Sequence, residues 1–171
     1  MDAVKILSKI LFYLARLLAT IYLGSAFHSM IALATGWSLV YGENAKFFSV
    51  CFPFTQTPFL TGDNNFAYMV FGFLLPMSLY GVFFLLLSNV FKVFFQTRLF
   101  TENHIKHLRW FYLANLILPT VVTLLSRIFS EVDEIAGVLI GLHFLIGIFA
   151  YFLAAIFKQG VHLQNEQDLI V

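Results

Sequence analysis

The chain has 171 residues, of which 60% are hydrophobic and 11% are charged, and its mean hydropathy is +0.87. A soluble domain of this size needs more polar side chains to cover its core, so the composition excludes an ordinary soluble fold and predicts a chain embedded in lipid. The net charge of +1 gives no indication of direct nucleic-acid binding, and the single cysteine, Cys51, excludes an intramolecular disulfide.

Long apolar runs predict the membrane-spanning segments. A helix that crosses the hydrocarbon core needs roughly 20 apolar residues, and residues 66–91 and 135–157 contain no Asp, Glu, Lys or Arg. Shorter uncharged runs at 17–34 and 110–126 are extended by apolar or interfacial residues. We therefore predict four transmembrane helices and a tail, at about 8–34, 66–95, 104–128, 135–160 and 161–171. The expected fold class is all-α: a single-domain integral membrane four-helix bundle with a long aromatic extracytoplasmic loop between its first two helices.

That loop, residues 35–65, is rich in aromatic residues and broken by glycines and prolines such as Gly42, Pro53 and Pro58. The β-prone run 46–52 is flanked by turn-forming sequence, which favours a small hairpin or interfacial cap. An aromatic belt that caps the bundle is favoured over a ligand-binding lid.

The distribution of Lys and Arg predicts the orientation, because cytoplasmic segments carry the excess of positive charge. Eight basic residues fall on the side of the termini and of the 92–109 segment, against two on the other side: Lys5, Lys9, Arg16, Lys92, Arg98, Lys106, Arg109 and Lys158, against Lys46 and Arg127. Both termini are therefore expected in the cytoplasm of a bacterial cell, with the chain in the cytoplasmic (inner) membrane.

Polar residues inside a span are costly and are candidate functional groups. The candidates that lie deeper within the predicted helices are His28, Asn89, Asn115 and His143. Hydrogen bonding within the bundle is the commoner role of such residues. The alternative is that they line a cavity for transport or sensing of a small molecule or ion, opened where Pro76 and Pro119 interrupt their helices.

Gly137 and Gly141 have the GxxxG spacing that lets a second helix approach closely. A helix of the same chain is the favoured partner, and homo-oligomerisation is the alternative.

Charged and polar residues gather in "RLFTENHIKHLR", residues 98–109, between the second predicted helix and the start of the third. Thr101 is a suitable N-cap for the third helix, and Phe100 is placed to pack on Ile105 as a hydrophobic staple. Lys106 and Arg109 are three residues apart and share a helix face. We expect this segment to be the internal cytoplasmic turn.

Two segments resemble signatures of a bacterial membrane protein family known as domain of unknown function 2975. "FKQGVHLQNEQDLIV" is similar to the family's C-terminal pattern F-x-x-G-x-x-L-x-x-E-x-x-L-T-[IV], with Ile170 in place of the usual Thr. "LFTENHIKHLR" is similar to a second pattern, P-F-T-x-E-N-x-x-x-L-R, with Leu99 in place of Pro and Glu102 one position early. The resemblance implies a four-helix membrane protein. It also implies a partner, because members are often encoded beside a small helix-turn-helix regulator of the Xre/Cro type.

No enzyme motif, cofactor motif or metal-ligand spacing is present. We therefore expect a non-enzymatic protein that docks or controls a cytoplasmic helix-turn-helix regulator. A structural subunit of a membrane assembly is a further alternative. The expected partner-binding residues lie in the turn and the tail: Arg98, Thr101, Asn103, Lys106, Arg109, Gly160, Leu163, Glu166, Asp168 and Leu169.

Overall fold

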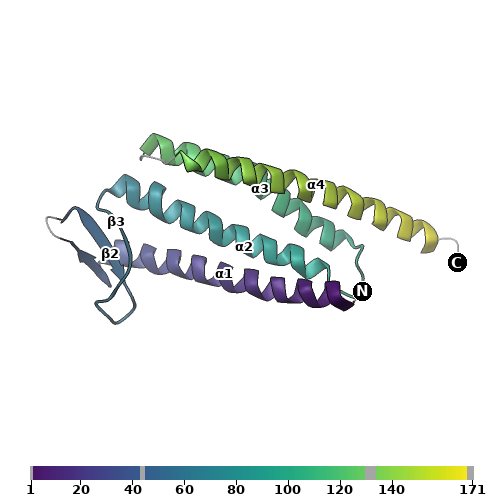
Figure 1. Ribbon diagram of the computed structural model, residues 1–171, viewed down its shortest axis with the longest axis horizontal. Helices are drawn as coiled ribbons and strands as arrows, with labels where there is room; N and C mark the ends of the chain where they lie inside the picture. The colour runs from purple at the N-terminus through teal and green to yellow at the C-terminus, as the bar shows by residue number, and fades with distance from the viewer. Residues whose placement is uncertain (1, 43–44, 130–133, 169–171) are drawn as a thin grey trace.

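The structure is a computed structural model that describes residues 2–42, 45–129 and 134–168, and four long helices run side by side through this part of the chain (Figure 1). They are α1 (Asp2–Thr35), α2 (Leu75–Val93), α3 (Glu102–Phe129) and α4 (Ile135–Asp168), and the π-helix η2 (Tyr68–Leu74) leads directly into α2. The chain begins and ends at one end of the bundle, here called the termini end. The opposite end, called the sheet end, carries a small β-sheet.

The four predicted spans are confirmed as helices, and each is long and apolar enough to cross a membrane. Large apolar side chains cover the outside of the helices, for example Phe27, Ile128 and Phe149. The residues buried on α1 are mostly small, such as Ala19 and Ser29. This distribution is the reverse of that in a soluble bundle. It fits a membrane protein, because small residues allow close helix contacts where lipid already solvates the apolar exterior.

The fourth helix is longer than the sequence predicted. It continues without interruption past residue 160 to Asp168 instead of giving way to a separate tail. Residues 161–168 contain no proline and are rich in Gln and Glu, which favour helix. His162 Nε2 also lies 3.4 Å from Glu166 Oε1, one helical turn later. The final apolar triplet, Leu169 to Val171, is outside the described residues.

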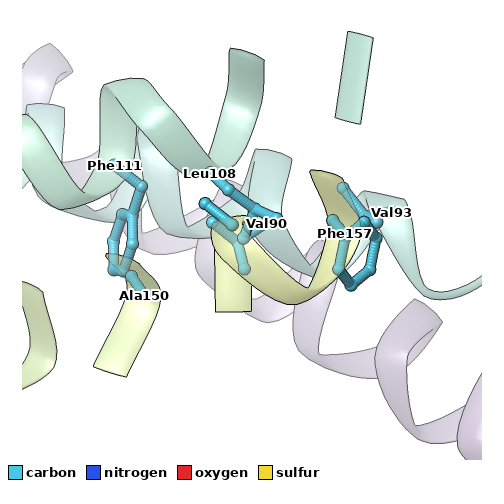
Figure 2. Packing of buried hydrophobic residues seen from close by; sticks show 7 residues of the cluster. Val90, Val93, Leu108, Phe111, Ala150 and Phe157 are labelled. Carbon is cyan, nitrogen blue, oxygen red and sulfur yellow. The ribbon is translucent and has the colours of Figure 1, made fainter. Parts of the chain in front are cut away.

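The main hydrophobic core lies between α2, α3 and α4. Side chains from all three helices meet in one cluster, seen close up in Figure 2. Its buried members are Val90, Val93, Leu108, Phe111, Ala150, Ala154 and Phe157. By contrast, α1 packs mainly on α2 and contributes no residue to this cluster. The predicted four-helix bundle is therefore a three-helix core with α1 attached to its side.

The segment between α1 and α2 is more regular than an aromatic loop. It forms a three-stranded antiparallel sheet of β1 (Leu39–Tyr41), β2 (Phe47–Cys51) and β3 (Pro58–Asp63), with β2 in the centre. The predicted β-prone run 46–52 coincides with β2, but the sequence did not predict β1 and β3. Phe48 and Val50 are fully buried and pack with Ala32 of α1. The helical bundle is thus confirmed, while this segment departs from an all-α fold.

The two prolines predicted to disturb their helices occupy different positions. Pro76 stands in the first turn of α2, directly after the π-helix. Because proline has no N–H, Pro76 cannot continue the backbone hydrogen bonds that run from the π-helix into α2, such as the one from the N–H of Leu75 to the carbonyl of Val70. Pro119 lies inside α3, where it cannot donate a hydrogen bond to the carbonyl of Asn115 four residues earlier.

The contact between α1 and α2 depends on Gly81. A Cβ atom at this position would lie 2.6 Å from Leu23 Cδ2 and 3.2 Å from the backbone nitrogen of Leu23. Because a backbone atom cannot move aside as a side chain can, we expect Gly81→Ala to destabilise the chain by about 1–3 kcal/mol. The measurement is the thermal unfolding midpoint in mild detergent.

Gly24→Ala is the matched control, since a Cβ atom at Gly24 would meet nothing within 4 Å. It changes the same residue type on the facing helix and should leave the midpoint unchanged or slightly raised. Equal midpoints for the two variants would contradict the close approach of α1 and α2.

Candidate functional site

The two sequence motifs meet at the termini end of the bundle. Phe100 lies in the turn between α2 and α3, and Gly160 lies on α4. A Cβ atom at Gly160 would be only 2.5 Å from Phe100 Cδ1. The Phe100 ring also packs edge-on against Phe157, with their centroids 5.3 Å apart. Phe94 approaches the other side of this pair, 6.0 Å from Phe157. The glycine of one motif therefore makes room for the phenylalanine of the other.

Other residues of the turn also have structural roles. The backbone N–H of His104 donates to Thr101 Oγ1 over 3.3 Å, which confirms Thr101 as the N-cap of α3. His104 is buried, and its Nδ1 donates to the carbonyl of Leu99 over 2.7 Å. Phe100 and Ile105 both pack against the main core, while the direct contact between them that defines a hydrophobic staple stays a prediction. These contacts fix the start of α3 without any binding partner.

The polar residues predicted to bind a partner point outward. Their side chains are exposed on the turn and the first turns of α3, and they are Arg98, Asn103, Lys106 and Arg109. Leu163 and Glu166 are exposed on α4. Within the described residues Glu166 pairs with His162, and no basic residue of the turn reaches it. The side chain of Asp168 and all of Leu169 lie outside the described part of the chain.

Two grooves follow α4 at the termini end. One, of about 380 Å³, lies between α3 and α4 and includes Arg109 and Lys158 in its walls. The other, of about 510 Å³, runs along the last turns of α4 beside Phe100. It is lined by Phe100, Ile156, Gln159, Gly160, Leu163, Gln164 and Gln167. Among the described residues, no group of three or more His, Cys, Asp or Glu is placed to hold a metal ion.

The four polar residues predicted inside the spans do not form one site. His28 Nε2 donates to the carbonyl of Cys51 over 2.9 Å and so ties α1 to the sheet. Asn89 is half-buried on α2 and has no hydrogen-bond partner among the described residues. Only Asn115 and His143 meet: His143 Nδ1 lies 2.8 Å from Asn115 Oδ1, and both side chains are buried.

A cavity of about 260 Å³ opens between η2, α2, α3 and α4 toward the sheet end. The sequence predicted such a cavity at Pro76 and Pro119, and both prolines line it, as does His143. Asn115 borders a narrow adjoining space of about 10 Å³ behind His143. Neither His28 nor Asn89 contributes to these walls.

Several polar residues that line the cavity were not predicted from the sequence: Tyr68, Tyr80, Thr123 and Ser126. Aromatic and hydroxyl residues are common within membrane helices, so none of them is conspicuous alone. The signal that was present is their spacing: Tyr68, Gly72, Pro76 and Tyr80 recur every fourth residue and share one helix face.

Comparison with protein families confirms the resemblance that the two motifs indicated. The family described as "Protein of unknown function (DUF2975)" matches residues 53–171, well over half of the chain. The chain belongs to this family. No curated protein and no solved structure gives a significant match. The DUF2975 match includes both motifs, the cavity and the three-helix core, whereas α1 and the strands β1 and β2 precede it.

In this DUF2975 protein the GxxxG pair does not contact another helix within the described part of the chain. Cβ atoms at Gly137 and Gly141 would each meet nothing within 4 Å, so the favoured sequence interpretation is wrong for these residues. The close contact of α4 with α3 is made instead at Gly147, where a Cβ atom would lie 2.8 Å from Leu116 Cδ2. The spacing places both glycines on one face of α4, and that face points away from the other described helices.

The motif contact predicts the effect of one methyl group. Gly160→Ala should destabilise the DUF2975 chain by about 1–3 kcal/mol, because the new Cβ atom would overlap a phenylalanine ring that is itself packed against Phe157. Thermal unfolding in mild detergent measures the loss, and Gly137→Ala, at an open position on the same helix, is the control.

A second substitution should rescue the first. Adding Phe100→Leu to Gly160→Ala removes the overlapping ring, so the double variant should recover part of the lost stability. Strictly additive losses would show that the two motifs do not pack on each other.

Proposed function

We propose that this DUF2975 protein is a non-enzymatic, multi-pass protein of the bacterial cytoplasmic membrane that docks a soluble helix-turn-helix regulator at its termini end. In this orientation the termini end faces the cytoplasm. The excess of Lys and Arg near that end supports the assignment, because basic residues are enriched in cytoplasmic segments.

The observation that carries the proposal is the projecting end of α4. The helix extends past the turn between α2 and α3, so its last turns stand clear of the other helices (Figure 1). On these turns Leu163 is 60% exposed and lines the groove beside Phe100. An apolar side chain on an otherwise polar, projecting helix favours a protein partner over water or lipid.

The exposed charges at the termini end define the complementary partner surface. Arg98, Lys106 and Arg109 are exposed on the turn and first turns of α3, and none of them pairs with an acidic side chain in the described chain. A partner with an apolar contact residue for the groove, and with Asp or Glu elsewhere on its surface, would complement both features of this end. Such charges increase the rate and specificity of association more than its final affinity.

The structure separates residues that hold the fold from residues available to a partner. Thr101 and Gly160 serve internal packing and capping, so their appearance in the motifs needs no partner. Leu163 and the basic side chains make no comparable internal contact among the described residues, and a docking role accounts for them. The resemblance to the DUF2975 signatures supplies the class of partner, a small DNA-binding regulator.

The test replaces Leu163 with a charged residue. The partner tested is the helix-turn-helix protein encoded beside this chain. Leu163→Glu should reduce its co-purification in mild detergent by about tenfold or more, because a carboxylate in an apolar contact must be desolvated. Since Leu163 is exposed, the variant should retain the unfolding midpoint of the parent chain.

Asn165→Glu is the control, because it adds the same charge two residues away, on another face of the same exposed helix. It should leave co-purification unchanged. Undiminished recovery of the regulator with Leu163→Glu would contradict docking at this groove, as would equal losses for the two variants.

A further inference from the structure

The cavity near the sheet end arises from irregular helix geometry. A π-helix is uncommon and often marks a functional site, and here it occupies residues Tyr68–Leu74 on the wall of the cavity. Pro76 follows it directly, and Pro119 interrupts the hydrogen-bond ladder of α3 on the facing wall. Gly72 and Ala136 add little side-chain volume. The space is thus bounded on two sides by helices that depart from regular α geometry.

Hydrogen bonds fix which tautomer a neutral His143 adopts in the cavity wall. Asn115 Nδ2 donates to the carbonyl of Phe111 over 2.8 Å, so its Oδ1 is the atom that faces His143. His143 must then donate from Nδ1 to Asn115 Oδ1, and in a neutral ring Nε2 becomes an acceptor. His143 is 7% exposed, and its Nε2 has no partner among the described residues.

The walls favour an uncharged ligand. Among the described residues, the lining contains no Asp, Glu, Lys or Arg, and an unpaired charge in such a place would be costly. Leu79, Val122, Leu139 and Ile140 make much of the wall apolar. Tyr80 and Thr123 add hydroxyl groups that can donate or accept. Together with the His143 acceptor, these groups match an apolar molecule that carries a single hydrogen-bond donor.

The size and position of the space limit the ligand further. An apolar cavity of about 150 Å³ can hold benzene, so about 260 Å³ suits a molecule of one or two rings. Ile135, which lines the cavity, is 63% exposed, so the cavity reaches the surface of the bundle. A ligand of this kind dissolves in the bilayer and can enter from it.

We propose that this cavity is a binding site for a small neutral aromatic alcohol of one or two rings, whose hydroxyl group donates a hydrogen bond to His143 Nε2. The site is separate from the docking groove, so either assignment can fail while the other holds.

The experiment compares two probes on the intact chain in lipid nanodiscs, with binding to empty nanodiscs subtracted. The probe 2-naphthol has the hydroxyl donor, whereas 2-methoxynaphthalene has nearly the same shape and no donor. We expect 2-naphthol to bind about tenfold more tightly, as for one buried hydrogen bond. Equal affinities would overturn the role of His143, and no binding above empty nanodiscs would overturn the site, because the space would then be filled by acyl chains or by nothing.

Two variants locate the binding. Leu139→Trp places an indole in the cavity and should abolish specific binding of 2-naphthol. Val138→Trp, at the adjacent position, which is 63% exposed, should leave binding and the unfolding midpoint unchanged. If Leu139→Trp folds like Val138→Trp and still binds 2-naphthol, the ligand occupies some other place and the proposal is wrong. If Leu139→Trp fails to fold, His143→Phe serves instead, and unchanged preference for 2-naphthol in that variant would equally contradict the assignment.

Discussion

Solvation of the apolar exterior by lipid is the constraint on which the rest of this structure depends. Large apolar side chains lie exposed along α1, α3 and α4, whereas many buried positions hold Ala, Ser or Gly. Removing apolar surface from water cannot drive the helices together when that surface remains in acyl chains. Association must instead come from close packing and internal hydrogen bonds. Gly81 and Gly147 allow two helices to approach closely, and Gly160 allows the turn at Phe100 to approach α4. The same constraint explains why each polar group within the bundle matters.

The two ends of the bundle differ in what their polar groups do. At the sheet end, His28 ties α1 to the sheet, and His143 stands beside a cavity. At the termini end, the motif residues divide into an internal set, with Phe100 packed over Gly160, and an external set of exposed basic side chains with Leu163. This division lets one short segment hold the fold and also carry the side chains of the proposed docking surface. The internal contact holds the turn against α4, and the basic side chains lie exposed on the turn and the first turns of α3.

The sequence predicted the helical architecture because a long run of apolar residues without charges is a strong, local signal of a membrane-spanning helix. The spans, the N-cap at Thr101 and a β-prone run at 46–52 all follow from neighbouring residues. Features that depend on tertiary contacts were missed or misassigned. Three features require knowledge of which elements meet: the direction of the Gly137 and Gly141 face, the pairing of β1 and β3 with β2, and the packing of α1 mainly on α2. The prolines indicated a cavity, but which polar residues line it depended on how the helices are rotated.

The membrane orientation is the central claim, and accessibility of two introduced cysteines tests it most directly. The test replaces Lys106 or Lys46 with cysteine, and both positions are exposed at opposite ends of the bundle. The native Cys51 is fully buried and serves as an internal control. In intact spheroplasts, a membrane-impermeant maleimide should label the cysteine at position 46 at once and the one at position 106 only after permeabilisation. Labelling of position 106 from outside while position 46 stays protected would contradict the account.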